Sequence, residues 1–204
     1  SYTLPPVTHG TLRIEAELLL DWYWPAVHGA EVSGGIRASF NNLWEAVFTQ
    51  LDAMPRGWLL RDYHSPNLIA LDDRAPPHDV GIIDFQDARM GLPQYDAVSL
   101  LRASYVVDAY MDLEHLRKYY YDLAREAGIL HMSPEEYEYL FEIMSFQRNI
   151  KAVGTFAYQK TSLGRDRYEP CIGKTLRSVF RYAPAQKILR KTAALIQELT
   201  GVRP

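Results

Sequence analysis

The hydrophobic positions near the start of the chain repeat with the spacing of an amphipathic helix. Ile14, Leu18 and Trp22 lie four residues apart, and this pattern predicts a helix from about Thr11 to Val27. Pro25 is expected to kink or end that helix, because proline lacks the backbone N–H that a helix interior requires.

A second helix is predicted over Arg37–Met54, after a glycine-containing loop over 28–36. Pro55 and Gly57 are expected to stop it. Its apolar residues fill one face without exception, and they are Phe40, Leu43, Trp44, Val47, Phe48 and Leu51.

The middle of the chain carries three short apolar runs with the length of strands rather than helices. They cover Trp58–Leu60, Leu68–Leu71 and Val80–Ile83, and turn residues bound each of them. The spacer Asp72–Asp79 suits a hairpin connection between the second and third runs.

Helical patterns resume after Gly91 and continue to the end of the chain. The predicted helices cover Tyr95–Arg102, Leu113–Ala127 before Gly128, and a long stretch capped by Ser133 that runs to about Lys160; Leu163–Pro170 breaks the pattern before two final helices. Helices, a small strand cluster and more helices indicate an α+β fold that is mostly helical.

Composition and charge narrow the classes of function. The 204 residues are 48% hydrophobic and 23% charged, with a formal net charge of −3, so no global basic field is expected to recruit nucleic acid or anionic lipid. No run of about 18 apolar residues predicts a membrane span. The single cysteine, Cys171, excludes an internal disulfide and favours a reducing, cytoplasmic location. The oligomeric state is left open.

Polar side chains gather in the loop after the first predicted strand and just after the third. They are Asp62, His64, Asn67, Asp84, Gln86 and Asp87. Asn67 and Asp84 would offer the hard oxygen ligands that suit Mg²⁺, which takes one or two protein carboxylates and completes its shell with water and phosphate oxygens. Asp62, five residues before the amide, can accept a hydroxyl proton. Together these residues have the chemistry that phosphoryl transfer requires.

The pattern Asp-x-x-x-x-Asn, followed by a hydrophobic strand and Ile-Asp-Phe, resembles the catalytic core of the aminoglycoside phosphotransferase and choline kinase group. These are small-molecule kinases with a protein-kinase-like fold. The segments LLRDYHSPNL, GIIDFQDARMG, YDAVSLL and FQRNIKAVGTFAYQK are similar to one branch. That branch comprises bacterial anomeric sugar kinases that phosphorylate N-acetylmuramate and N-acetylglucosamine in cell-wall recycling, and the resemblance runs roughly from Leu12 to Ile188.

The resemblance implies a role for each matching residue and implies ATP and Mg²⁺ as cofactors with a sugar as acceptor. Asp62 would be the catalytic base, and Asn67 and Asp84 would be the magnesium ligands. Asp96 would be a buried acceptor that braces the loop carrying Asp62 and Asn67, called the catalytic loop below. Many relatives have histidine where this chain has Leu60, which would remove a bracing hydrogen bond.

The remaining polar residues keep two interpretations each. His64 either orients Asp62 or the sugar, or hydrogen-bonds within the loop. Gln86 and Asp87 either contact metal or sugar, or brace the loop. Arg148 and Asn149 either line the acceptor site or lie on a solvated helix face.

Two parts of a complete kinase of this fold have no counterpart in the sequence. No lysine precedes Lys118, and Gly34-Gly35 is not flanked by predicted strands. Kinases of this fold grip the phosphates with a glycine-rich hairpin and a strand lysine, both before the catalytic loop. Residues 1–204 are therefore expected to be the C-terminal lobe without its nucleotide-binding N-terminal lobe, and inactive alone.

Three alternatives remain open at this point. One alternative keeps the fold and replaces the sugar acceptor by an aminoglycoside or an amino alcohol. Another is a pseudokinase or interaction module that has lost catalysis. The basic stretch Arg177–Lys191 is either a solvated helix face or a contact for an acidic substrate or partner.

Overall fold

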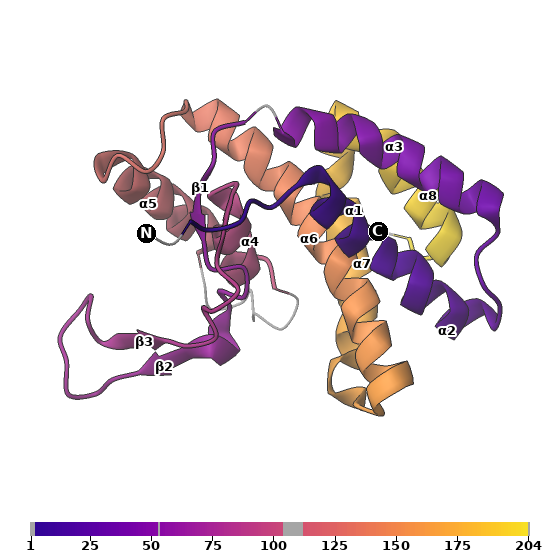
Figure 1. Cartoon of the computed structure of the whole chain (residues 1–204), viewed down its shortest axis with the longest axis horizontal. Helices are drawn as coiled ribbons and strands as arrows, with labels where there is room; N and C mark the ends of the chain where they lie inside the picture. Colours follow the sequence, from indigo (N-terminus) through magenta and orange to yellow (C-terminus); the bar gives the residue numbers. More distant parts are fainter. Residues whose placement is uncertain (1–2, 53, 104–111, 204) are drawn as a thin grey trace. The chain divides into compact units, whose positions relative to one another are not determined.

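The computed structural model describes residues 3–52, 54–103 and 112–203, and most of them are helical (Figure 1). The chain forms two compact units. The first unit comprises Ser1–Val7 and Pro55–Tyr137, and the second comprises Thr8–Met54 and Glu138–Pro204. Over the described residues, no helix combines the length and the apolar composition needed to span a bilayer.

The second unit begins with the helix that the sequence predicts over Thr11–Val27. Helix α1 (His9–Leu18) continues through a π-helical turn (Leu19–Tyr23) into α2 (Trp24–His28). It starts earlier than predicted because the Thr8 hydroxyl accepts a hydrogen bond from the Thr11 N–H at 3.2 Å. Pro25 does not end it, since proline is tolerated in the first turn of α2.

Helix α3 (Gly34–Asp52) confirms the second predicted helix, although residue 53 of the prediction lies outside the described residues. The helix starts three residues early because the Ser33 hydroxyl accepts a hydrogen bond from the Ile36 N–H at 3.3 Å. Its predicted face is buried except for Leu43, which is half-buried. The Trp44 ring lies 5.2 Å from the ring of Phe146, so this face forms the core of the second unit with α6.

Helix α6 (Pro134–Leu163) is the long helix predicted from Ser133. The Ser133 hydroxyl accepts a hydrogen bond from the Glu136 N–H at 3.2 Å, as a capping serine should. The helix ends at Leu163, three residues later than the predicted Lys160, and Gly164 follows with a φ of +62°. The first few residues of α6 belong to the first unit and the rest to the second.

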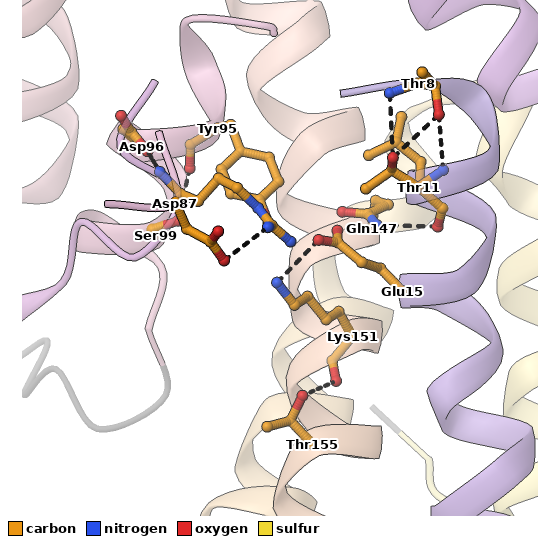
Figure 2. Close-up of polar contacts among 12 residues, drawn as sticks. Thr8, Thr11, Glu15, Asp87, Tyr95, Asp96, Ser99, Gln147, Lys151 and Thr155 are labelled. Carbon is orange, nitrogen blue, oxygen red and sulfur yellow. Dashed lines mark hydrogen bonds and ion pairs between the residues drawn. The ribbon is translucent and has the colours of Figure 1, made fainter. Parts of the chain in front are cut away.

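Helices α1 and α6 approach closely within the second unit. A Cβ atom at Gly154 would overlap the backbone of Leu18, so only glycine fits there. The side chains of both helices also meet at a buried ion pair, in which Lys151 Nζ lies 3.0 Å from Glu15 Oε1 (Figure 2). Gln147 Nε2 donates to the other Glu15 oxygen at 3.1 Å.

Two opposing effects set the pKa of Glu15. Burial raises the pKa of this carboxyl group, but the positive charges of Lys151 and Arg148 and the hydrogen bonds from Lys151 and Gln147 lower it. The net result is a pKa below the ordinary value of 4.5. Glu15 is therefore ionised in the folded state at neutral pH.

The C-terminal part confirms the two predicted final helices, α7 (Glu169–Tyr182) and α8 (Arg190–Thr200). Short 3₁₀ turns over Ala183–Ala185 and Lys187–Leu189 join them. The predicted break over Leu163–Pro170 contains another 3₁₀ turn, Asp166–Tyr168.

The described residues of the first unit form four short strands. The predicted strands are confirmed as β1 (Gly57–Leu59), β2 (Leu68–Ala70) and β3 (Val80–Ile82), and β2 and β3 form the predicted antiparallel hairpin. Over the described residues, the strands form two separate two-stranded sheets. Strand β1 pairs instead with β4 (Arg89–Gly91), a strand that the sequence did not predict.

The glycine at the end of β4 allows this strand to lie close to β1. A Cβ atom at Gly91 would overlap the side chain of Leu59 on β1 and crowd Val7. The Val7 N–H donates to the Met90 carbonyl at 2.7 Å, so the N-terminal segment also joins β4. Three-residue strands carry little hydrophobic pattern of their own, which is why β4 was missed.

Two further helices lie in the described part of the first unit. Helix α4 (Gln94–Leu101) follows β4 directly, and α5 (Leu113–Glu126) ends before Gly128, whose φ is +70°. Both agree with the predicted spans to within a residue at each end. Helix α5 contacts the start of α6, where the Tyr121 ring lies 5.1 Å from the ring of Tyr137. The buried apolar side chains of this unit include Leu59, Leu92, Tyr95, Val98, Leu101, Tyr121, Leu130 and Tyr137.

Candidate active site

The catalytic loop begins where the backbone leaves β1, and Asp96 holds this point. Asp96 lies in the first turn of α4, and its two carboxylate oxygens accept hydrogen bonds from the Leu60 N–H at 2.6 Å and the Arg61 N–H at 3.0 Å. The side chain is half-buried rather than buried as expected. Asp96 therefore contacts the loop as the resemblance implied, and it does so through the backbone (Figure 2).

The backbone that Asp96 holds is strained. Arg61 has a φ of +70°, a left-handed conformation that costs a non-glycine residue about 1–2 kcal/mol. The two hydrogen bonds offset this cost. They also show that Leu60 contributes through its N–H, so the missing histidine side chain does not leave the start of the loop without support.

Asn67 is the centre of the catalytic loop. Its amide nitrogen donates to the Asp62 carbonyl at 2.9 Å and lies 3.4 Å from Asp84 Oδ2. The same nitrogen lies 3.3 Å from His64 Nε2. These contacts all use the nitrogen of the amide, so its oxygen is not occupied by them.

The β2–β3 hairpin brings Asn67 and Asp84 together although 17 residues separate them. Leu68, directly after Asn67, pairs with Ile82, and the Ile83 N–H donates to the Asn67 carbonyl at 3.1 Å. Asp84 follows immediately with a φ of +61°, the second non-glycine residue in the left-handed region. The prediction that these two residues meet rests on this register.

The Asp62 side chain differs from those of Asn67 and Asp84 in its hydrogen-bond contacts. Its carbonyl accepts from both the Asn67 amide and the His64 N–H, the latter at 3.1 Å, so the backbone of Asp62 is fixed. Its carboxylate makes no hydrogen bond or ion pair with any other residue in the described part of the chain. A fixed backbone with an uncommitted, half-exposed carboxylate suits a group that accepts a proton.

Gln86 and Asp87 both contact protein groups. Gln86 Nε2 donates to Asp84 Oδ1, so the Asp84 carboxylate is oriented from two sides, by Gln86 and by Asn67. Asp87 lies 3.3 Å from Arg61 Nη1 and 3.4 Å from Arg89 Nη2. These are the contacts of loop-orienting residues, and direct contact with a metal or sugar stays a prediction for both.

The donor set fits a magnesium ion. No group of three or more His, Cys, Asp or Glu side chains is arranged to hold a metal among the residues described. Mg²⁺ does not need such a group, because it binds through one or two protein oxygens and keeps waters and phosphate oxygens. The Asp84 carboxylate and the free oxygen of the adjoining Asn67 amide supply that number.

Two phenols near Asp96 were not singled out from the sequence as part of this region. Burial, and secondarily the negative charge of Asp96, raises the pKa of Tyr63. The same causes, with Tyr63 added, raise the pKa of Tyr120 to about 12. Tyr120 donates to the Pro93 carbonyl at 3.3 Å. Both phenols therefore stay protonated at neutral pH.

Residues Arg148 and Asn149 belong to the second unit. Asn149 is buried and Arg148 is half-buried, with its charge acting on Glu15. Neither lies on a fully solvated face, and a role in acceptor binding stays a prediction.

The strand–loop–hairpin arrangement, with its carboxylate base candidate and its Asn–Asp pair, defines a class of phosphate-transferring protein. Residues 12–129 match the phosphotransferase enzyme family, and the chain belongs to this family.

Relatives within this family have more specific names. Over 204 aligned residues the chain is 31% identical to the N-acetylmuramate/N-acetylglucosamine kinase of Neisseria meningitidis serogroup B, covering 97% of this chain and 58% of that protein. It is 30% identical to the kinase of the same name from Pseudomonas aeruginosa, covering 98% of this chain and 57% of that protein. The Pseudomonas putida kinase of that name is 29% identical over 81% of this chain and 48% of its own length. The chain thus spans about half the length of the curated relatives it matches.

Proposed function

We propose that this chain supplies the catalytic loop and metal ligands of an ATP- and magnesium-dependent kinase for a sugar hydroxyl. The acceptor would be the anomeric hydroxyl of N-acetylmuramate or N-acetylglucosamine, in cell-wall recycling in the cytoplasm. The observation that carries the proposal is the position of Asn67, whose single amide reaches both the Asp62 backbone and the Asp84 carboxylate. The names of the relatives support the choice of acceptor.

Each residue of the site has a distinct part in this reaction. The Asp62 carboxylate would orient the acceptor hydroxyl and take its proton as the phosphoryl group is transferred. Asn67 Oδ1 and the Asp84 carboxylate would hold the magnesium ion, which neutralises phosphate charge when bound. Gln86 would keep Asp84 in the required orientation. Positioning of this kind accounts for much of the acceleration in phosphoryl transfer.

The nucleotide needs a further binding surface, and the β2–β3 hairpin is suited to be part of it. Ile69 on β2 is 46% exposed, and Val80 and Ile82, which lie on the other face of the hairpin on β3, are 46% and 41% exposed. Apolar side chains on both faces of a two-stranded hairpin are unfavourable in water unless something covers them. We propose that a nucleotide-binding lobe outside these 204 residues covers them and provides the lysine that is missing before Lys118.

The first experiment measures kinetics in the complete encoded polypeptide. Asp62→Asn should lower kcat by about 10²–10⁴-fold and leave the affinity for magnesium nucleotide nearly unchanged, because the base acts only on the acceptor. Asp84→Asn should weaken magnesium-nucleotide binding. Asp72→Asn, in the exposed turn between β2 and β3, is the matched control and should change neither. Loss of nucleotide binding in Asp62→Asn would show that the two roles are exchanged.

A panel of acceptors tests the substrate. N-acetylmuramate and N-acetylglucosamine should be phosphorylated in preference to aminoglycosides and choline. If the protein prefers aminoglycosides or choline, the proposed acceptor is wrong, but the proposed mechanism still holds. Failure to phosphorylate any acceptor, with an intact Asp62, would favour a pseudokinase. Phosphorylation by residues 1–204 alone would contradict the need for a further lobe.

A further inference from the structure

A run of positive charge without any negative charge marks the C-terminal part of the second unit. From residue 170 to residue 197 the chain has no Asp or Glu and has six cationic residues, Lys174, Arg177, Arg181, Lys187, Arg190 and Lys191. We call these six residues the basic stripe. The second unit has 14 Lys and Arg against 11 Asp and Glu, so the stripe accounts for its positive balance in a chain whose net charge is −3.

Helix α7 presents half of the basic stripe on one face. Lys174, Arg177 and Arg181 follow the i, i+3, i+7 spacing that places side chains along one side of a helix. All three are exposed. The opposite side of α7 is anchored in the core by buried side chains, and these are Thr175, Leu176, Val179 and Phe180. The orientation of the three cations toward solvent is therefore set by packing.

The other half of the stripe lies at the corner that joins α7 to α8. Lys187, Arg190 and Lys191 are exposed there. Arg190 Nε donates to the Pro184 carbonyl at 2.8 Å, which holds this side chain against the turn that follows Arg181. The two halves of the stripe thus adjoin at the end of α7.

Acidic side chains of the described residues do not neutralise the charge of the basic stripe. Within the described residues, none of its six cations forms an ion pair. Other exposed cations of the chain do have acidic partners: Arg37 pairs with Asp21 at 2.7 Å, Lys118 with Asp122 at 2.7 Å, and Lys160 with Glu169. The positive field over the stripe therefore extends into solvent, while charges beyond about 8–10 Å are screened at physiological salt.

The side chains exposed around the basic stripe indicate which class of partner binds it. No exposed residue from 170 to 203 is a large apolar or an aromatic side chain. A protein partner would find little exposed apolar surface to bury there, and the ring of Tyr182, next to Arg181, is half-buried rather than open for bases to stack on. Lipid headgroups need neither, because clusters of four to eight Lys and Arg on a helix surface bind anionic membranes by charge alone.

We propose that the basic stripe docks this protein on the headgroup surface of anionic bilayers without insertion. The global charge of −3 does not exclude this, since adsorption depends on the charge of the face turned toward the lipid. The association should be reversible and should weaken steeply as salt rises. This proposal is independent of the catalytic chemistry proposed above.

The test is sedimentation of the chain with vesicles of phosphatidylcholine containing increasing amounts of phosphatidylglycerol. Binding should rise with phosphatidylglycerol, fall with salt and be absent on pure phosphatidylcholine. The triple substitution K174Q/R177Q/R181Q should lower partitioning by about 100-fold, since each cation near an anionic surface contributes about fivefold. The control R37Q/K118Q/K160Q makes the same change in net charge at paired cations and should retain binding. Circular dichroism and thermal melts check that both variants fold.

Each outcome decides the proposal. A second variant, K187Q/R190Q/K191Q, tests the corner half of the stripe and should also lose binding. No binding of the unmodified chain to phosphatidylglycerol vesicles at low salt overturns the proposal. Equal loss in the control variant, or unchanged binding in both stripe variants, overturns it as well. Tighter binding to duplex DNA or RNA than to the vesicles would assign the stripe to nucleic acid and overturn the membrane proposal.

Discussion

Replacing Asp96 by asparagine removes part of the support for the start of the catalytic loop. The carboxylate accepts two hydrogen bonds, from the Leu60 and Arg61 N–H groups at 2.6 and 3.0 Å. An asparagine side chain has one oxygen and one NH₂ group, so it can accept from one N–H and must turn a donor toward the other. One backbone N–H would lose its partner, and the remaining bond would lose its charge.

The expected magnitude follows from these two contacts. A hydrogen bond to a charged group contributes about 1.5–3 kcal/mol net, and the half-exposed position of Asp96 favours the lower part of that range. We therefore expect local destabilisation by about 2 kcal/mol. The positive φ of Arg61 adds to the effect, because a left-handed residue relaxes once the contacts that hold it are weakened.

Hydrogen exchange measures this change at the two amides themselves. A loss of about 2 kcal/mol corresponds to roughly 30-fold faster exchange of the Leu60 and Arg61 N–H groups in Asp96→Asn. The control is Asp122→Asn, which removes the same charge from an exposed pair with Lys118 on α5 and should leave both amides unchanged. Unchanged exchange of these amides in Asp96→Asn would refute the claim that Asp96 braces the loop.

Two further predictions concern the contact of α1 with α6. Gly154→Ala should lower the free energy of unfolding in urea by about 3 kcal/mol, because the new methyl group overlaps the Leu18 backbone. Gly35→Ala, with open space around it, should change stability by less than about 1 kcal/mol, and a similar loss in both would contradict the packing argument. Glu15→Gln should cost about 2 kcal/mol at neutral pH through its bond to Lys151. The folded pKa of Glu15 lies below 4.5, so its contribution is complete above that value and is lost as the pH falls through the folded pKa. Unfolding measured against pH should therefore show the difference between the two proteins shrinking below about pH 4.5, and a constant difference would count against the ion pair.

The sequence alone determined the helices and the chemical identity of the site. Helix α3 could be predicted because its apolar face, Phe40 to Leu51, repeats with the period of the helix over about three turns, and burial of that face is what stabilises the helix. Asp62 and Asn67 could be paired because five residues around a proline turn keep them within one loop. The hairpin was also predictable, since a polar spacer joined two apolar runs.

Only the tertiary structure decided which distant residues meet. Asp84 reaches Asn67 through the register of β2 and β3, and a shift of one residue would have turned its side chain to the other face. Strand β4 exists because β1 and Val7 supply its hydrogen bonds, and a segment as short as Arg89–Gly91 has no pattern that shows this. Lys151 neutralises Glu15 from 136 residues away, because close packing at Gly154 brings α1 against α6. Spacing along the chain specifies local structure, whereas these contacts depend on how whole elements pack.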